Sequence, residues 1–298
     1  MTPTRFSALI GGLLMAAAAF APGAAQAATD RITFKVGDER RSATISERAR
    51  LKRQLRPVLI VLPTTSGRNA TLARRSARFE QFANRGGILV QAEPLKGAWR
   101  PGPDGVAAEL DYLRALVREV TSRTLANPRR IYIVGVGGGG MVALQAACRD
   151  ARLYAGVTAI LAALPEPAAA ACAPGKALPA QLVVGTADKN VPIGGGPSGV
   201  AEYKGSFASA EASLAPFAAA AGCSDKRTRT PLADRDRNDA SRVVTEQYEG
   251  CKAPIRIARI EGGGHVLPSL AGGQRVTGQN RDVSVRGLTL SFFRLPGV

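Results

Sequence analysis

The chain has 298 residues, with 40 Lys and Arg against 23 Asp and Glu, so its formal net charge is +17. Aromatic residues make up only 5% and do not alternate with the basic clusters, which excludes the aromatic stacking platform of single-strand nucleic-acid binders. We interpret the basic residues as a solvated face open to polyanion contact, with no specific nucleic-acid partner.

The first 27 residues have the pattern of a signal peptide. Arg5 precedes an apolar run over residues 6–21, and residues 25–27 (Ala-Gln-Ala) have the small side chains that a signal peptidase requires. A proline and a glycine break the run, which disfavours a membrane anchor because a spanning helix needs about 20 apolar residues. We expect cleavage after residue 27, one domain over residues 28–298, and a secreted or periplasmic protein.

Four cysteines remain after this segment, and an even number in an oxidising compartment indicates two disulfides with three possible pairings. The simplest pairing joins close neighbours, Cys148 with Cys172 and Cys223 with Cys251. The chain has one histidine and no CxxC pair, so neither a metal site nor a cofactor is expected.

Short apolar runs alternate with amphipathic segments along the rest of the chain. An opening hairpin is expected at residues 31–36 and 42–46, and further strands at 57–63, 86–94, 129–136, 155–164, 180–188 and 253–265, the last with its loop. Helices are expected at 106–120, 139–149, 207–222 (closed by Gly222) and 283–295. The polar stretch 224–242 is interpreted as a long surface loop.

This alternation predicts an α/β fold with a mostly parallel sheet and helices on both faces. Ligands bind such sheets at the carboxyl ends of the strands. The loops expected there are residues 63–67, 135–140 and 186–192, together with the loop around His265.

The turn Gly135–Gly140 is open to three interpretations. It satisfies the dinucleotide pattern G-x-G-x-x-G, but the acidic residue expected at the end of the next strand is missing. It also fits the nucleophile elbow G-x-S-x-G, with Gly135 and Gly139 as the outer glycines and Gly137 at the serine position. A third possibility is a structural turn that lets the helix pack closely on the sheet.

Two later loops favour the elbow. Asp188 follows an expected strand, and His265, the single histidine, lies in a glycine-rich loop near the C-terminus. This order of nucleophile position, acid and base is the one found in α/β-hydrolases. The acid and base are therefore present, whereas the attacking oxygen is missing.

Five ordered motifs resemble the secreted poly(3-hydroxybutyrate) depolymerase and feruloyl esterase-like branch of the α/β-hydrolases. They are "RPVLIVLP", "ELDYLRALV", "NPRRIYIVGVGGGGMVALQAAC", "VVGTADKNVPIGGG" and "IEGGGHVLPS". The resemblance implies an α/β-hydrolase fold with Asp188 as triad acid and His265 as base. It also places Gly137, which cannot react, at the nucleophile position, and Cys223 and Cys251 at a family disulfide.

The oxyanion loop also departs from the family pattern, since Pro63-Thr64-Thr65 replaces His-Gly and Pro63 has no amide hydrogen. We expect the amide of Gly138 to provide one oxyanion donor, and Thr64 or Thr65 the other. Trp99 is expected either to line the pocket or to belong to the core.

These features predict an exported carboxylic-ester hydrolase without its serine, inactive or very weak, acting on a small or polymeric ester. One alternative is a non-catalytic binding protein that uses the old ester cleft. The other is a hydrolase with a substitute nucleophile, which would be Thr64, Thr65, Ser66 or water.

Overall fold

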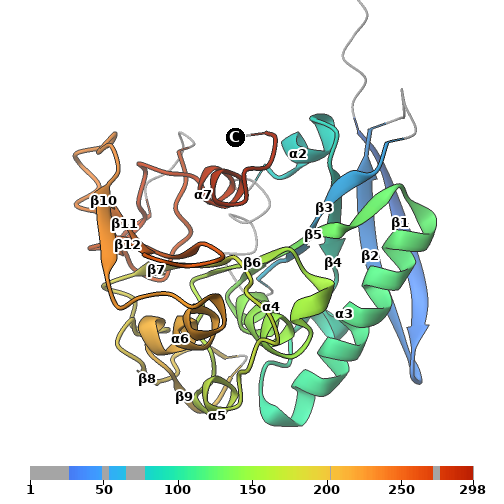
Figure 1. The fold of residues 1–298 in the computed structure, drawn as a ribbon, viewed down its shortest axis with the longest axis horizontal. Helices are drawn as coiled ribbons and strands as arrows, with labels where there is room; N and C mark the ends of the chain where they lie inside the picture. The colour runs from blue at the N-terminus through green and yellow to red at the C-terminus, as the bar shows by residue number, and fades with distance from the viewer. Residues whose placement is uncertain (1–26, 49–53, 65–77, 202, 271–275, 298) are drawn as a thin grey trace, which may run out of the picture.

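The computed structural model describes residues 27–48, 54–64, 78–201, 203–270 and 276–297 (Figure 1). The predicted signal peptide lies outside the described residues, apart from Ala27, and so do Thr65 and Ser66. No helix within the described part of the chain is long and apolar enough to cross a membrane.

Ten strands of the described chain form one mixed sheet. They are β1 (Ala28–Val36), β2 (Glu39–Glu47), β3 (Arg56–Leu62), β4 (Ile88–Ala92), β5 (Ala126–Val136), β6 (Gly156–Ile160), β7 (Ala180–Gly185), β10 (Arg227–Pro231), β11 (Arg242–Tyr248) and β12 (Ile255–Glu261). Their order in the sheet is β1-β2-β4-β3-β5-β6-β7-β12-β11-β10. A separate small sheet pairs β8 (Gly196–Pro197) with β9 (Ser206–Phe207).

The six central strands, from β4 to β12 in the sheet order, run parallel, and the outer strands on both sides are antiparallel. Every residue of β6 and β7 is buried, as expected for strands covered on both faces. All six parallel strands were expected from their apolar runs, and the opening hairpin is formed by β1 and β2. The predicted fold class, a mostly parallel sheet between helices, is confirmed.

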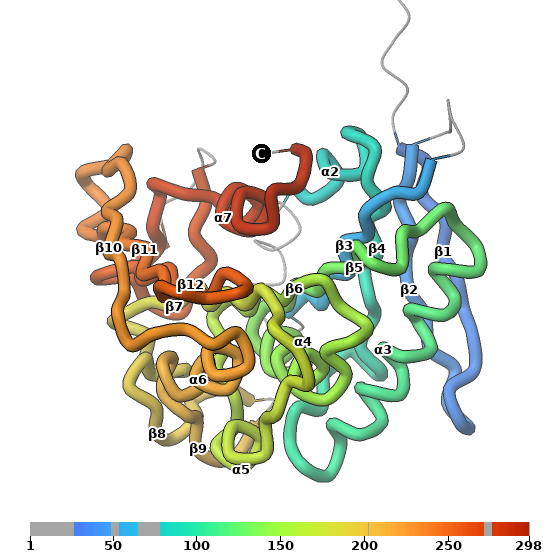
Figure 2. Tube along the Cα trace, viewed as in Figure 1, coloured from blue at the N-terminus to red at the C-terminus, as the bar shows by residue number. Residues whose placement is uncertain are grey.

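Helices cover both faces of the sheet (Figures 1 and 2). One face carries α2 (Glu80–Asn84) and α7 (Val285–Phe292), and the other α3 (Pro103–Arg123), α4 (Gly138–Arg149), α5 (Glu166–Ala170) and α6 (Ala210–Ala221). Short 3-10 helices span Leu95–Gly97 and Ala151–Leu153. Each face has its own hydrophobic cluster, so the sheet lies between two cores.

The helix boundaries follow from local chemistry. The Ser209 side chain accepts a hydrogen bond from the Ala212 amide at the start of α6, and Gly222 ends the helix with a φ of 66°. The apolar face expected on α3, which includes Leu110, Leu113 and Val120, is buried against the rest of the protein. In α4, only Arg149 is not buried, because the helix is enclosed between the sheet and its neighbours.

The interpretation of residues 224–242 as a surface loop was wrong in part. Residues Arg227–Pro231 form the edge strand β10, paired antiparallel with β11, which begins at Arg242. All five residues of β10 are exposed, so the strand carries no apolar run that would mark it in the sequence. The last strand in the chain, β12, was recognised, but β11 was not.

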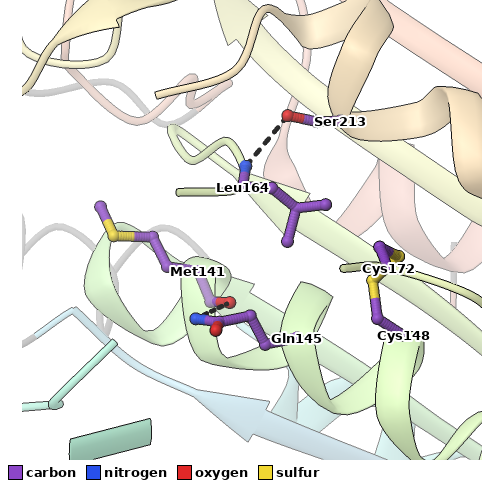
Figure 3. The surroundings of a disulfide bond; sticks show 6 residues. All are labelled: Met141, Gln145, Cys148, Leu164, Cys172 and Ser213. Atoms are coloured by element: carbon purple, nitrogen blue, oxygen red, sulfur yellow. Dashed lines mark hydrogen bonds between the residues drawn. A yellow bond between two sulfur atoms is a disulfide. The ribbon is translucent and has the colours of Figure 1, made fainter. Parts of the chain in front are cut away.

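Two disulfides are present, and both match the simplest of the three pairings. Cys148 near the end of α4 bonds to Cys172 after α5, with 5.0 Å between the Cα atoms. Figure 3 shows this disulfide at the C-terminal end of α4, with Gln145 and Met141 in the earlier turns of the same helix. Cys223 after α6 bonds to Cys251 after β11, with a Cα separation of 4.1 Å. Each disulfide therefore joins a helix end to a segment more than 20 residues further along the chain.

Candidate active site

The glycine turn connects β5 directly to α4. Val136 ends the strand, Gly138 begins the helix, and Gly137 between them has φ 54° and ψ −125°. This backbone conformation is one that L-residues rarely adopt. It is fixed by two hydrogen bonds: the Gly137 amide donates to the Ile160 carbonyl (2.9 Å), and its carbonyl accepts from the Met141 amide (3.1 Å).

The other glycines of the turn are required by close packing. A Cβ on Gly135 would lie 2.2 Å from the Gly139 carbonyl oxygen, and one on Gly139 would lie 2.5 Å from the Leu62 carbonyl oxygen. A Cβ on Gly140 would lie 2.6 Å from Cβ of Ala162. These three positions bring the helix onto the strands as closely as backbone atoms allow, so any side chain there would displace the helix or the sheet.

Gly137 differs, because a Cβ there would meet one flexible side chain and no described backbone. Apart from the turn itself, the described atoms within 4 Å of a Cβ at this position belong to Thr64, with Oγ1 at 3.1 Å and Cβ at 3.6 Å. Gly137 therefore combines a strained backbone with a position that a small side chain can occupy if Thr64 moves by a few tenths of an ångström. Both properties are expected of the central residue of a nucleophile elbow.

Asp188 lies in the loop after β7 and is only 5% exposed. Its Oδ1 accepts hydrogen bonds from the amides of Asn190 (2.8 Å) and Val191 (2.9 Å). Its Oδ2 lies 2.7 Å from Nδ1 of His265. Both carboxylate oxygens are thus engaged, and this fixes the orientation of the carboxylate toward the imidazole.

His265 lies in the loop after β12, and this loop packs on the Asp188 loop. A Cβ on Gly185 would lie 2.3 Å from the Gly263 carbonyl oxygen, and the same oxygen accepts a hydrogen bond from the Ala187 amide (2.9 Å). The side chain of His265 is 17% exposed. A carboxylate beside Nδ1 favours the tautomer that carries its proton on Nδ1.

Sequence reasoning missed the residues that support the His265 loop. The Gln279 side-chain amide donates to the Leu267 carbonyl (2.9 Å), and the Asn280 carbonyl accepts from the Ser269 amide (3.0 Å). The Gly278 carbonyl accepts from the Gly264 amide (2.9 Å). Gln279 and Asn280 are buried, yet nothing in their sequence context distinguishes them from ordinary loop residues.

Thr64 follows β3 and is 8% exposed, with its hydroxyl toward the Gly137 position. The preceding residue is held by the indole of Trp99, whose Nε1 donates to the Pro63 carbonyl (2.7 Å). Trp99 is 1% exposed and belongs to the core, so of its two expected locations the structure selects the core. Gly138, the expected oxyanion donor, is the first residue of α4 and is buried.

The structure therefore brings the sequence-predicted residues together in two pairs. Gly137 and Thr64 follow the adjacent strands β5 and β3, while Asp188 and His265 follow the adjacent strands β7 and β12. Only β6 separates the two pairs in the sheet. Since the four strands are parallel, all four residues lie at the same edge of the sheet.

Comparison with known proteins relates the chain to esterases, although no family model matches it. It is 28% identical over 232 residues to a Nocardia uniformis subsp. tsuyamanensis protein named "Putative esterase NocK", which covers 72% of this chain and 66% of NocK. It is 29% identical over 178 residues to feruloyl esterase B of Piromyces equi, which covers 58% of this chain and 32% of that protein. The aligned part of the chain thus spans less than two thirds of each relative's own length.

Solved structures with the same architecture include two esterases and a "putative dipeptidyl aminopeptidase IV" from Bacteroides ovatus, which aligns with a TM-score of 0.53 at 10% identity, covering 91% of this chain and 36% of that one. An acetyl xylan esterase from Aspergillus awamori aligns with a TM-score of 0.56 at 14% identity, covering 90% of this chain and 99% of that one. A thermostable esterase aligns with a TM-score of 0.51 at 13% identity, covering 79% and 55%. The chain has an α/β-hydrolase fold, and its sequence is similar to esterases.

Proposed function

We propose that this protein is a carboxylic-ester hydrolase in which Asp188 and His265 act as acid and base and Gly137 occupies the nucleophile's position, so that ester turnover is very slow. The observation that carries the proposal is the 2.7 Å contact between His265 Nδ1 and Asp188 Oδ2. A general base needs this arrangement, because the carboxylate orients the ring and stabilises the imidazolium that forms.

The turn at Gly137 explains why turnover should be slow. Its backbone has the strained conformation of an elbow, and a Cβ there would meet only the Thr64 side chain among the described atoms within 4 Å. Glycine has no oxygen, so no acyl-enzyme can form at this residue. Loss of the serine in a serine hydrolase lowers kcat by about a millionfold, and the rest of the site accounts for the residual rate.

The substrate class follows from similarity to esterases. The curated relatives carry the names esterase and feruloyl esterase, and the aligned structures include an acetyl xylan esterase. We therefore propose carboxylic esters of small or polymeric substrates as the class that this site accepts.

The test is hydrolysis of a short-chain nitrophenyl ester by the wild type, Gly137→Ser and Gly137→Ser/His265→Ala. We expect Gly137→Ser to raise the rate by at least about 100-fold, because a serine hydroxyl at this turn recovers part of the lost factor once Thr64 shifts by a few tenths of an ångström. Adding His265→Ala should remove this gain, because a general base contributes about 100- to 10,000-fold.

A matched control is Gly175→Ser, which adds a hydroxyl at an exposed loop glycine with nothing within 4 Å of its Cβ position. It should leave the rate at the wild-type level. A Gly137→Ser protein that is folded yet no faster than this control would show that Gly137 is not the nucleophile's position. Fast wild-type turnover would contradict the proposed low activity.

We also propose that the protein is exported and loses residues 1–27. The two disulfides support this, because disulfides persist in oxidising compartments. The mature N-terminus of protein secreted by a bacterial host, measured by intact mass spectrometry, should be Ala28. Protein retained at full length in the cytosol would contradict the proposal.

A further inference from the structure

The side chain of Thr64 faces the space that the missing serine would occupy. The register between β3 and β5 places Leu62 beside Gly135, so two residues further along both strands Thr64 reaches the level of Gly137. Oγ1 of Thr64 lies 3.1 Å from the Cβ position at residue 137, nearer than the threonine Cβ at 3.6 Å. The hydroxyl oxygen of Thr64 is thus the atom of this side chain that lies nearest to the Cβ position of residue 137.

A serine oxygen at position 137 would be one covalent bond from its Cβ. The Thr64 oxygen therefore lies near the place where an elbow serine would present its oxygen, at most one C–O bond length beyond the 3.1 Å that separates it from the Cβ position of residue 137. Thr64 is 8% exposed, so its hydroxyl is largely shielded from bulk water. Low exposure favours reaction of a hydroxyl with a bound ester over competition from solvent.

The backbone that carries this hydroxyl is held in place. The Pro63 carbonyl accepts a 2.7 Å hydrogen bond from the buried indole of Trp99, and β3 is buried from Pro57 to Leu62. On the other side of β6, the Asp188 carboxylate lies 2.7 Å from His265 Nδ1 and orients the imidazole ring. A hydroxyl and an oriented base are thus supplied to one edge of the sheet by rigid strands.

We propose that Thr64 is the nucleophile of this site, in place of the residue at position 137. This inference rests on the proposed function, because it uses the same acid and base. The Thr64 hydroxyl is secondary, and it reaches the reacting position from β3 instead of from the elbow. A Thr64 nucleophile therefore accounts for slow turnover without requiring the site to be inert.

The reaction follows the two steps of a serine esterase. The Thr64 oxygen bonds to the ester carbonyl carbon as His265 takes the hydroxyl proton, and the ester C–O bond then breaks as that proton passes to the departing alcohol. Water attacks the threonyl ester, His265 takes one water proton and returns it to the Thr64 oxygen, and the carboxylic acid leaves. No oxidant, metal or further reactant is required.

Covalent labelling tests this assignment directly. The full chain is incubated with a biotinylated alkyl fluorophosphonate, whose phosphorus bonds to the nucleophilic oxygen while fluoride leaves and the base takes the proton. We expect one adduct per chain, mapped to Thr64 by peptide mass spectrometry. Thr64→Val, which keeps the shape and removes the hydroxyl, should abolish the adduct, and His265→Ala should slow labelling by at least about 100-fold.

Labelling of Gly137→Ser distinguishes two outcomes: Thr64 is not the nucleophile, or the acid–base site itself is wrong. A wild type that is unlabelled, or labelled at Thr65, Ser66 or elsewhere, overturns the role of Thr64 if Gly137→Ser is labelled at residue 137. If Gly137→Ser is folded and also unlabelled, the acid–base site itself is wrong, and both proposals fall. Thermal melting of each variant establishes that it is folded.

Discussion

At the scale of single residues, the glycine turn divides into positions set by packing and one position set by backbone conformation. Gly135, Gly139 and Gly140 lie where any Cβ would overlap neighbouring atoms. A Cβ on Gly137 would instead make one tight contact, 3.1 Å from Oγ1 of Thr64, and its φ is 54°. Gly139 is the clearest packing position, because its nearest neighbour is the β3 backbone, which cannot move aside as a side chain can.

Gly139→Ala should therefore destabilise the fold by about 1–3 kcal/mol or more, the usual cost of overpacking. Urea unfolding followed by circular dichroism measures the change. Gly175→Ala is the matched control, since a methyl group there meets nothing within 4 Å, and it should stay within about 0.5 kcal/mol of wild type. Equal unfolding midpoints for the two variants would contradict the packing at Gly139.

Asp188 is the second residue for which a single substitution has a predicted effect, here on the rate of ester hydrolysis. In the Gly137→Ser background, Asp188→Asn should lower ester hydrolysis by about 10,000-fold, because an amide at this position favours the wrong tautomer of His265. Asp111→Asn, at an exposed carboxylate on α3, is the control and should leave the rate unchanged. A small effect of Asp188→Asn on a folded protein would mean that the carboxylate does not orient the base.

At the scale of elements, helix α3 is attached to the sheet by a buried ion pair. Glu109 on α3 is fully buried and contacts Arg41 of β2 at 2.7 Å, and its second oxygen accepts from Arg100 at 2.9 Å. The Arg41 guanidinium also lies 3.9 Å from the centre of the Tyr112 ring. The pair thus joins the outer strand β2 to the helix across the core.

Glu109→Ala should cost about 3–5 kcal/mol in unfolding free energy, because it leaves the buried Arg41 charge with only the more distant Glu39 carboxylate, at 3.9 Å. The matched control is Glu119→Ala on the same helix. Glu119 pairs with Arg123 one turn along the helix, where both side chains are partly exposed, and this pair contributes only about 0.3–0.5 kcal/mol. Comparable losses in the two variants would contradict the importance of the buried pair.

The elements also show how much the sequence could predict. Buried parallel strands such as β3 and β7 produce continuous apolar runs, and glycine-rich turns mark the ends of β5 and β12, so the central sheet and its loops were recognised. The edge strand β10 was missed because all its side chains face solvent. Asp188 and His265 were found through motif order, although they lie 77 residues apart in the chain.

Other parts of the site depend on strand register, which sequence does not reveal. The alignment of Leu62 with Gly135 brings Thr64 to the level of Gly137, while Thr65 and Ser66 lie outside the described residues. From sequence alone, Thr64, Thr65 and Ser66 were equivalent candidates across the cleft. The support of the His265 loop by Gln279 and Asn280 likewise arises from tertiary contacts between polar loop residues.

At the scale of the whole molecule, one disulfide joins the end of α4 to the segment after α5, and the other joins the end of α6 to the segment between β11 and β12. Their sequence separations are 24 and 28 residues. Closing loops of this length reduces the conformational freedom of the unfolded chain and stabilises the fold by about 3–4 kcal/mol each in the chain-entropy model.

Replacing either pair by alanine, Cys148→Ala/Cys172→Ala or Cys223→Ala/Cys251→Ala, should therefore lower the unfolding free energy by about 2–4 kcal/mol. Urea unfolding of the two double variants under non-reducing conditions measures this, and reduced wild type should lose stability at least as great. If reduction leaves the urea midpoint unchanged, the disulfides do not constrain the chain.

The contact between Trp99 and the Pro63 carbonyl gives the molecule a built-in spectroscopic probe. Trp99 is the only tryptophan in the chain, so all indole fluorescence comes from one site. Its ring is buried, and its N–H is bonded to the residue that immediately precedes Thr64. Emission should therefore be blue-shifted in the native state and should change when a ligand displaces the Pro63–Thr64 backbone. Titration of ester analogues can thus measure occupancy of the site even where no product is formed.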